Sequence, residues 1–445
     1  MSIVDLGRIR AALDRCDPLV LEGRVTRAAG LLIEASLPRV GVGTACEVRL
    51  DGGRTVAAEV VGFHGATALL MPFGDVHGVC EGCAVVPRAS AADVPVGEAL
   101  LGRGGDATMR PVDGGPPLLL SSRVPIDRDP PPAMARRRIA RPVVTGIRAL
   151  DAFLTVGEGQ RLGALAGPGV GKSVLMGMLA RSAGAEVVVV GLVGERGREV
   201  REFVERDLGE KGLRRTVVVV ATADEPPLRR IRAAMAATSV AEWFRSRGKR
   251  VLLLVDSLTR VAMAQREIGL AAGEPPTSKG YPPSVFFRLP RLVERAGNDH
   301  GEGSITALYT VLAEGDDLTD PVADAARAAL DGHVVLSRKL AAAGHFPAID
   351  VLGSVSRVMT DVADPKHLEL ARGGREVLAA YAESADLIEV GAYVAGSNPR
   401  VDRALRCIAP LQAFLRQGPT DRSQLPETLS SLGRLLAPVP EARRG

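Results

Sequence analysis

Residues 163–179 read GALAGPGVGKSVLMGML, and their glycines are spaced as in loops that hold phosphate groups. An apolar run precedes this stretch and a helical pattern follows it, which is the context that such a loop requires. Glycines let backbone N–H groups face the phosphates at the beginning of a helix, and the lysine reaches the β and γ phosphates. The predicted nucleotide-binding residues are Gly167, Pro168, Gly169, Val170, Gly171, Lys172 and Ser173.

A second candidate is Asp256, which directly follows the apolar run of residues 251–255. Ligands of open α/β sheets lie beyond the carboxyl ends of the strands, so Asp256 is expected near the phosphate loop. A carboxylate and a hydroxyl are oxygen ligands of the kind that Mg²⁺ prefers. We therefore predict Ser173 and Asp256 as the metal ligands.

Glu195 ends another apolar run, and a group that aligns a water with the γ phosphate needs such a place beside the loop. The alternative is a surface carboxylate that pairs with Arg196 or Arg198. The spacing alone leaves both interpretations open.

The elements that must position these residues follow a repeated pattern of strand, turn and helix. Charged helical patterns at 198–211 and 228–247 alternate with continuous apolar runs at 161–166, 186–193, 216–221, 251–255 and 305–312. Strands that are apolar on both faces, with helical crossovers, predict a parallel sheet covered on two sides. We expect a phosphate-loop (RecA-like) α/β core at 143–360 and a small helical C-terminal domain at 361–445.

The first third of the chain has a different pattern. Short apolar stretches separated by Gly, Pro and Asp turns predict a small β-barrel or sandwich, and we expect a β-barrel at 19–90, preceded by an amphipathic helix within 1–18. That helix would pack on the barrel or dock onto a partner. Residues 91–142 are rich in Gly, Pro and Arg and are expected to form a linker that wraps onto the next domain. The arginine run 136–138 is expected to be solvated.

The composition of the chain argues against several kinds of binding surface, targeting segment and cross-link. Aromatic residues make up only 3% of the 445 residues and the formal net charge is +4, so neither a nucleic-acid surface nor a membrane surface is indicated. The N-terminus does not have the apolar stretch of a signal peptide, and no run is long enough to span a bilayer. Five scattered cysteines argue against a disulfide framework, and Cys80–Cys83 without a second ligand pair predicts a turn between strands.

Several long motifs occur in a fixed order, and together they resemble the type III protein export ATPase family of flagella and injectisomes. That family is similar to the catalytic and non-catalytic subunits of rotary ATP synthases. The resemblance covers nearly the whole chain and is strongest at 141–359. The motifs are GERGREV at 194–200, DSLTR at 256–260, EPPTSKGYPPSV at 274–285, EGDD at 314–317 and FPAIDV at 346–351.

The resemblance implies roles for residues that the spacing leaves undecided. Glu195 would activate the water, and Arg196 and Arg260 would belong to the polar network around the γ phosphate. Phe346 would pack on the adenine of ATP, where the family often has Tyr. Arg357, in the segment SVSR at 354–357, would reach into the site of a neighbouring subunit.

One chain carries both Glu195 and Arg357, which the synthases divide between two kinds of subunit. Every interface in a ring of identical copies, expected to be a hexamer, would then be catalytic. The alternative is that Arg357 forms a structural salt bridge in its own chain.

The resemblance implies a cytoplasmic ATPase, peripheral at the inner-membrane export apparatus, that uses ATP and Mg²⁺ to power type III export, with flagellar components favoured over injectisome substrates. Expected partners are a stator or regulator dimer at the N-terminal helix, export chaperone–substrate complexes and the membrane export gate. A subunit of an ion-coupled ATP synthase, a nucleic-acid translocase and a non-enzymatic nucleotide-binding subunit are the other interpretations, and no nucleic-acid partner is expected.

Overall fold

The computed structural model describes residues 21–88, 93–312 and 320–437. The predicted helix at 1–18 and the EGDD motif at 314–317 lie outside these residues. The chain divides into two compact units, of which the first contains the residues up to Asp93 together with Glu267–Glu274. The second contains Val94–Arg266 and the residues from Pro275 onward.

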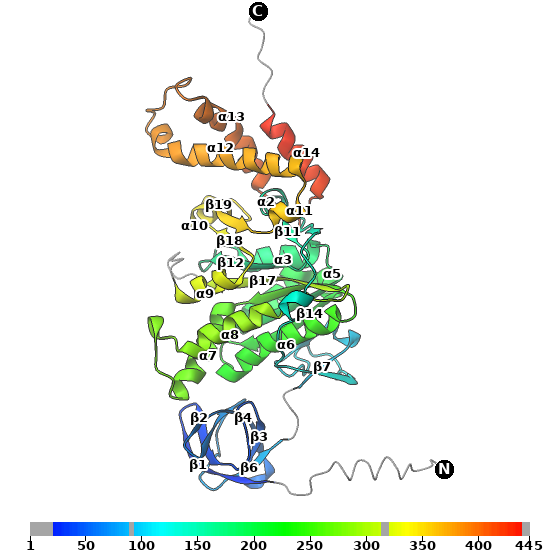
Figure 1. Cartoon of the computed structure of the whole chain (residues 1–445), viewed down its shortest axis with the longest axis vertical. Helices are drawn as coiled ribbons and strands as arrows, with labels where there is room; N and C mark the ends of the chain where they lie inside the picture. The colour runs from blue at the N-terminus through cyan, green and yellow to red at the C-terminus, as the bar shows by residue number, and fades with distance from the viewer. Residues whose placement is uncertain (1–20, 89–92, 313–319, 438–445) are drawn as a thin grey trace, which may run out of the picture. The chain divides into compact units, whose positions relative to one another are not determined.

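The first unit is a closed barrel of six antiparallel strands in the order β1-β2-β5-β4-β3-β6 (Figure 1). Side chains that alternate along the strands, such as Val25, Ile33, Val48 and Val85, are buried inside it. The predicted barrel is therefore confirmed. Its strands are β1 (Gly23–Ala29), β2 (Leu32–Ser36), β3 (Ala45–Arg49), β4 (Thr55–His64), β5 (Thr67–Pro72) and β6 (Ala84–Pro87).

The Cys80–Cys83 segment forms a turn between β5 and β6, as the sequence predicts. The two sulfur atoms lie 3.3 Å apart. The turn closes the barrel, because the Gly82 N–H donates to the Val25 carbonyl, and the Val25 N–H donates to the Cys83 carbonyl.

The second unit is built on a nine-stranded sheet in the order β19-β18-β12-β17-β15-β13-β14-β8, with β16 paired to β17. The five central strands are parallel, and both of their faces are buried. The predicted α/β core is thus confirmed. These central strands are β12 (Arg161–Ala166), β13 (Val187–Glu195), β14 (Thr216–Thr222), β15 (Arg250–Asp256) and β17 (Ser304–Leu312).

Helices cover both faces of this sheet. On one face, Val188 and Leu252 share a hydrophobic core with Leu175 and Met176 of α3 (Lys172–Ser182). On the other face, α6 (Pro227–Arg245) packs across β13, β14 and β15. A Cβ atom at Gly191 would lie 3.1 Å from the Ala237 side chain, so this glycine lets α6 approach the sheet closely.

The strands outside the five central ones have no counterpart in the apolar runs of the sequence. β18 (Gly332–Leu336) and β19 (Ile349–Ser356) are antiparallel to each other and only partly buried. The very short β8 (Gly104–Gly105) pairs with β14 at the other edge. β16 (Gly297–Asn298) runs antiparallel to β17. Half-buried or very short strands do not produce the continuous apolar pattern by which the central strands are recognised.

Residues 93–142 are folded against the core at several points. β7 (Asp93–Val96) pairs with β9 (Ser122–Pro125), and β10 (Pro142–Val143) pairs with β11 (Val156–Gly157). The expectation that the arginine run 136–138 is solvated is wrong for its first two residues. Arg136 donates to the carbonyls of Glu294 and Ala296, and Arg137 donates to those of Glu302 and Gly303. These arginines fix the segment by satisfying backbone acceptors at the end of α8 (Pro283–Glu294) and in the following turn.

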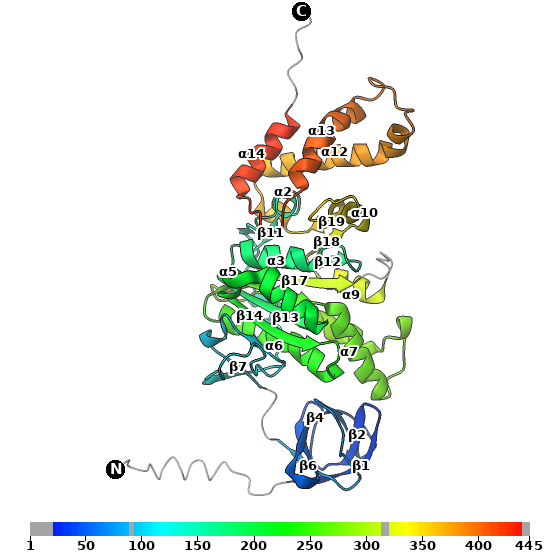
Figure 2. The same cartoon turned by 180° about the vertical axis from the view of Figure 1, so that it is seen from behind.

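Three helices follow the sheet: α12 (Pro365–Glu389), α13 (Pro399–Leu415) and α14 (Leu425–Leu436). They contact one another and α2 (Arg148–Phe153), as both views of the chain show (Figures 1 and 2). A Cβ at Gly374 of α12 would lie 2.5 Å from the Phe153 ring, so the backbone of α12 lies directly on α2. Among the described residues, no helix is long and apolar enough to cross a membrane.

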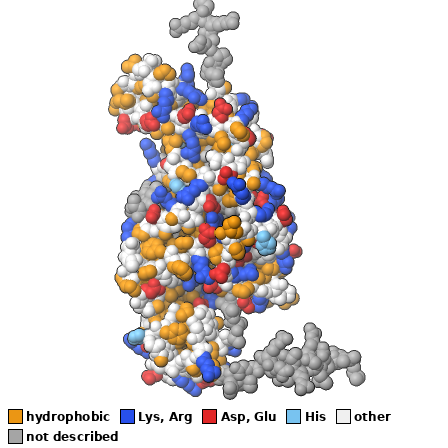
Figure 3. Space-filling view, in the orientation of Figure 1, with side chains coloured by type: hydrophobic (Ala, Val, Ile, Leu, Met, Phe, Trp, Pro, Cys, Tyr) orange, Lys and Arg blue, Asp and Glu red, His pale blue; other side chains and the backbone are white. Residues whose placement is uncertain are grey.

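Acidic and basic side chains are interspersed on the face of the α/β core seen in Figure 3. Proteins that bind nucleic acid through the phosphate backbone gather their positive side chains into a stripe or patch. The visible face of the core shows no such grouping.

Candidate functional site

The phosphate loop connects the carboxyl end of β12 to the beginning of α3, the place that the sequence predicts. Gly169 and Gly171 have φ angles of 78° and 93°, which a residue with a Cβ rarely adopts. Gly171 directly precedes the first turn of α3, whose backbone N–H groups have no partner within the helix. The loop therefore has the backbone form of a phosphate-binding helix N-terminus.

Lys172 lies at the centre of the site. Its Nζ atom is 2.7 Å from Oδ1 of Asp256 and 3.3 Å from Oε1 of Glu195. Burial opposes the charge on Lys172, but the two carboxylates outweigh it and raise the pKa of the lysine. The structure thus brings together the three charged residues that the sequence predicts from three separate segments.

Asp256 is 2% exposed, and its Oδ1 also accepts a hydrogen bond of 2.6 Å from the Thr310 hydroxyl. Thr310 comes from β17, which is the neighbour of β15 in the sheet. The sequence analysis did not identify Thr310, because its role depends on which strands are adjacent.

Glu195 is a partly buried carboxylate with an unusual protonation equilibrium. Burial and the negative charge of Asp256 raise its pKa to about 7, although Lys172 acts in the opposite direction. A hydrogen bond that protonated Glu195 donates to the Glu199 carboxylate, in the first turn of α4 (Gly197–Glu202), contributes to the raised pKa. A general base works best with a pKa near the working pH, so Glu195 has the properties needed to accept a proton from water. Glu199 is a second functional neighbour that the sequence analysis did not identify.

The donor set fits the predicted metal. The hydroxyl of Ser173 and the carboxylate of Asp256 supply hard oxygen ligands, and Ser173 directly follows Lys172 at the beginning of α3. The Asp256 carboxylate already attracts a cation, since it is paired with Lys172.

Phe346 lies beside the phosphate loop. A Cβ atom at Gly171 would be 3.6 Å from the Phe346 ring, and the side chain is 43% exposed. The Gln417 N–H, from the loop between α13 and α14, donates to the Phe346 carbonyl and holds this segment in place. The ring is therefore available to a flat ligand beside the phosphates. The sequence analysis did not identify Gln417, which is distant in the chain.

Arg260 lies in the first turn of α7 (Leu258–Ala271), and its aliphatic carbons pack where a Cβ of Gly194 would stand. Among the described residues, its buried Nε atom has no hydrogen-bond partner. Arg196 lies at the surface, where its side chain is 79% exposed and pairs with Glu199 at 3.7 Å. Its side chain therefore pairs with Glu199, the residue that also hydrogen-bonds to Glu195.

Arg357 does not join this cluster. It follows β19, where its N–H donates to the Asp331 carbonyl, and its side chain is exposed. Within the described ranges the Arg357 side chain forms no ion pair, and this does not support the alternative of a salt bridge in its own chain.

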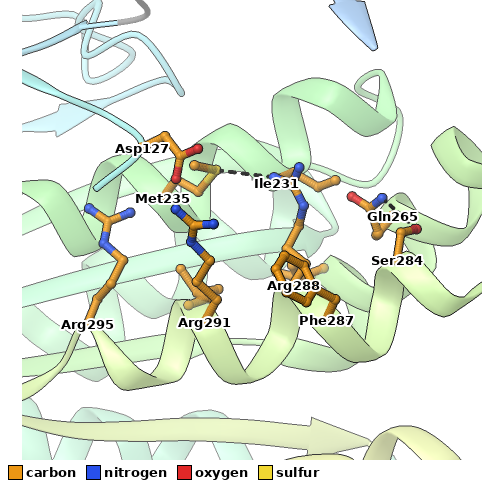
Figure 4. Close-up of a pocket in the computed structure, with 11 residues that line it drawn as sticks. Asp127, Ile231, Met235, Gln265, Ser284, Phe287, Arg288, Arg291 and Arg295 are labelled. Atoms are coloured by element: carbon orange, nitrogen blue, oxygen red, sulfur yellow. Dashed lines mark hydrogen bonds between the residues drawn. The ribbon is translucent and has the colours of Figure 1, made fainter. Parts of the chain in front are cut away.

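A separate cavity of about 130 Å³ lies between α6, α7 and α8 (Figure 4). Met235, Phe287, Arg288 and Arg291 are among the residues that line it. None of the predicted site residues does so, and the cavity is therefore distinct from the phosphate loop.

A phosphate loop on a parallel sheet, a lysine between two acidic residues and an aromatic ring beside the loop define an ATP-binding hydrolase. Family models agree along the chain: the ATP synthase alpha/beta family beta-barrel domain matches residues 25–88, its nucleotide-binding domain matches 146–356, and the T3SS EscN ATPase C-terminal domain matches 363–434.

Similar proteins include the flagellum-specific ATP synthase of Pseudomonas aeruginosa, which is 51% identical over 94% of each chain. The type 3 secretion system ATPase of Sinorhizobium fredii is 50% identical over 95% of this chain and 93% of its own. The structure of the assembled ATPase EscN from enteropathogenic E. coli matches with a TM-score of 0.89 at 42% identity, covering 93% of this chain and all of that one. The chain belongs to the family of type III secretion and flagellar export ATPases, which is related to the alpha and beta subunits of ATP synthases.

Proposed function

We propose that this ATPase works as a ring of identical copies, expected to be a hexamer, in which each ATP site takes Glu195 from one copy and Arg357 from the next. The observation that carries the proposal is the position of Arg357 relative to the phosphate loop of its own chain. The related ATPase EscN, whose structure is described as assembled, supports self-association.

The strand register gives that position. Ser356, the residue before Arg357, pairs with Gly332 at the beginning of β18. Ala166, the last residue before the phosphate loop, pairs with Leu336 at the other end of β18. A strand rises about 3.3 Å per residue, so the two places are separated by roughly 13 Å along β18. Arg357 therefore begins at the opposite end of the strand from its own phosphate loop.

The chain's own residues divide the chemistry of hydrolysis. The phosphate loop and Lys172 hold the phosphates, Phe346 packs on the adenine, and Glu195 orients the water and receives its proton. Mg²⁺, held by Ser173 and Asp256, would supply charge stabilisation at the β and γ phosphates. An arginine that enters from a neighbouring subunit is worth roughly 10³ to 10⁵ in rate in other phosphate-loop enzymes, so isolated copies should be nearly inactive.

The work powered by this hydrolysis is, in our proposal, the export of flagellar components at the cytoplasmic side of the inner membrane. A stator or regulator dimer, chaperone–substrate complexes and the export gate would be the partners. The motif DEPP at 224–227 and the TSK variant at 277–279 favour the flagellar assignment. The injectisome assignment is the second candidate, because relatives of both kinds are about equally similar.

Mixing two inactive variants tests the shared site. Glu195→Gln and Arg357→Ala copies are each expected to be inactive as assembled rings, whereas mixed rings regain activity because some interfaces combine an intact Glu195 with an intact Arg357. Mixed rings that assemble and stay inactive would contradict the proposal.

The biological role is tested by affinity purification of tagged Glu195→Gln protein from the native cell, followed by mass spectrometry. Recovery of flagellar stator, chaperone and export-gate proteins supports the flagellar role. Recovery of injectisome proteins instead would overturn that role and leave the mechanism of hydrolysis in place.

A further inference from the structure

The backbone that carries Arg357 is held on several sides, and one of the holding groups comes from the C-terminal helices. The Arg357 side chain is exposed, so its direction depends on how firmly residues 354–356 are fixed. Hydrogen bonds from the core and from α12 hold these residues.

The core supplies three hydrogen bonds to this segment. The Arg357 N–H donates to the Asp331 carbonyl at 3.0 Å. The Ser356 hydroxyl accepts from the Gln160 side chain at 3.1 Å and donates to the Thr155 carbonyl at 2.9 Å. Gln160 is fully buried, so this side of the segment belongs to the rigid centre of the sheet.

A further contact comes from α12. A single nitrogen atom of Arg375, NH2, donates to the Ser354 carbonyl at 3.1 Å and to the Phe153 carbonyl at 3.2 Å. Ser354 is fully buried on β19, and Phe153 ends α2. One half-buried guanidinium therefore ties α12, α2 and β19 together, three residues before Arg357.

We infer that Arg375 is a positioning residue that sets Arg357 for the ATP site of the neighbouring copy. A planar guanidinium can satisfy two carbonyls in a fixed geometry, which a lysine ammonium on a flexible stem does less well. A displacement of α12 would move the Ser354 carbonyl and with it the start of the Arg357 segment. The helical domain is thereby linked to hydrolysis at an interface that it need not touch.

This inference rests on the proposed function, because it gives Arg357 a role outside its own chain. The first measurement compares steady-state kinetics of assembled wild type, Arg375→Ala and Arg375→Lys. Misplacing a catalytic group by about 1 Å can cost about 100-fold in rate, so we expect Arg375→Ala to lower kcat by roughly 10-fold or more. The KM for ATP should stay close to the wild-type value, and Arg375→Lys should restore part of kcat.

Arg372→Ala is the matched control. Arg372 lies one turn earlier on the same helix, is exposed, and forms no side-chain hydrogen bond or ion pair with the described part of the chain. It should keep the wild-type kcat. Thermal melting and sedimentation identify a variant that fails to fold or assemble, and in that case Arg375→Lys carries the comparison.

The decisive measurement mixes Arg375→Ala copies with Glu195→Gln copies. An Arg375→Ala copy keeps its own phosphate loop and Glu195, and a Glu195→Gln copy can offer it a well-placed Arg357. Activity of the mixed rings above that of either variant alone is therefore expected. A defect of Arg375→Ala confined to its own site would not be rescued in this way.

The outcomes separate this inference from the proposed function. Suppose that mixing with Glu195→Gln copies rescues Arg357→Ala. If Arg375→Ala then keeps the wild-type kcat, or is not rescued by the same mixing, the positioning role of Arg375 is wrong and the shared site stands. If Arg357→Ala is not rescued in assembled rings, the shared site fails, and the inference fails with it.

Discussion

Lys172 and Asp256 form a buried ion pair, in which the two side chains are 13% and 3% exposed and the nearest N···O distance is 2.7 Å. In this structure the lysine that is proposed to hold phosphates neutralises a carboxylate that is proposed to hold Mg²⁺. Binding of a nucleotide with Mg²⁺ would therefore replace the Lys172–Asp256 pair with a lysine–phosphate pair and a carboxylate–metal pair. In the nucleotide-free site, the Lys172–Asp256 pair leaves little uncompensated charge.

Replacing Lys172 with Met should destabilise the nucleotide-free protein as well as abolish ATP binding. Removing one partner of a buried pair costs about 3 to 5 kcal/mol, because the other charge stays buried. Urea unfolding of Lys172→Met should show a loss of this size. The double variant Lys172→Met with Asp256→Asn should recover part of the stability while remaining inactive.

A surface pair provides the control for this experiment. Lys249 pairs with Glu186 at 3.2 Å, and both side chains are well exposed, so Lys249→Met should cost less than about 1 kcal/mol. Equal losses of unfolding free energy for Lys172→Met and Lys249→Met would show that the buried Lys172–Asp256 pair stabilises the fold no more than a surface pair does.

The raised pKa of Glu195 predicts a pH-dependent stability. Folding raises the pKa of this group from 4.5 to about 7, so the folded state binds its proton more tightly than the unfolded state. The stabilisation is fully present below about pH 4.5 and is lost as the pH rises through about 7. Relative to wild type, Glu195→Gln should therefore gain stability between pH 5 and 7, and the difference should then level off.

Thermal melting without nucleotide, at intervals between pH 5 and 8.5, checks this expectation. Glu199→Gln is the matched comparison, because the hydrogen bond with Glu195 lowers the pKa of Glu199, and a lowered carboxylate pKa gives the opposite sign of pH dependence. Parallel curves for wild type and Glu195→Gln would contradict the raised pKa.

The sequence predicts the site where a local pattern defines it and does not where the site depends on contacts between distant segments. Lys172, Glu195 and Asp256 each end a strand or begin a helix in a recognisable context. Thr310, Gln417 and Arg375 act through neighbours that only the strand order and the packing of α12 and α13 establish.

The fold shows the same division. Central strands that are buried on both faces are continuous apolar runs, and the sequence predicts their first and last residues to within a few positions. β19 at the edge of the sheet and its neighbour β18 are only partly buried, and Arg136 is a charged residue whose partners lie about 160 positions away. Neither feature has a sequence signature that distinguishes it from a solvated loop.

A buried pair beside the cavity of Figure 4 gives a stability prediction away from the ATP site. Arg295 and Glu242 are 2% and 4% exposed and lie 2.8 Å apart, and Arg295 also donates to Ser239 and to the Ile126 carbonyl. Arg295→Met should therefore lower the free energy of unfolding by about 3 to 5 kcal/mol.

Arg291, one turn earlier on the cavity wall, is the control. Its pair with Asp129 is similarly short, at 2.7 Å, but the two side chains are 41% and 86% exposed, so Arg291→Met should cost less than about 1 kcal/mol. Chemical denaturation of both variants measures the difference. A loss for Arg291→Met as large as that for Arg295→Met would show that burial is not what distinguishes the two pairs.

The Phe346 ring should contribute to ATP affinity rather than to the chemical step. It is 43% exposed beside Gly171 of the phosphate loop, and stacking between aromatic rings is worth about 0.5 to 1.5 kcal/mol beyond the buried area. Phe346→Ala should raise the dissociation constant for ATP by roughly 3- to 10-fold, and kcat at saturating ATP should change little.

Two further variants serve as controls for the Phe346 ring. Phe346→Tyr keeps the ring and should bind like wild type. Phe287→Ala, which removes a ring that is 70% exposed on α8, should leave ATP binding unchanged. Titration with a fluorescent ATP analogue measures all three variants, and a Phe346→Ala affinity equal to that of wild type would remove the ring from the adenine site.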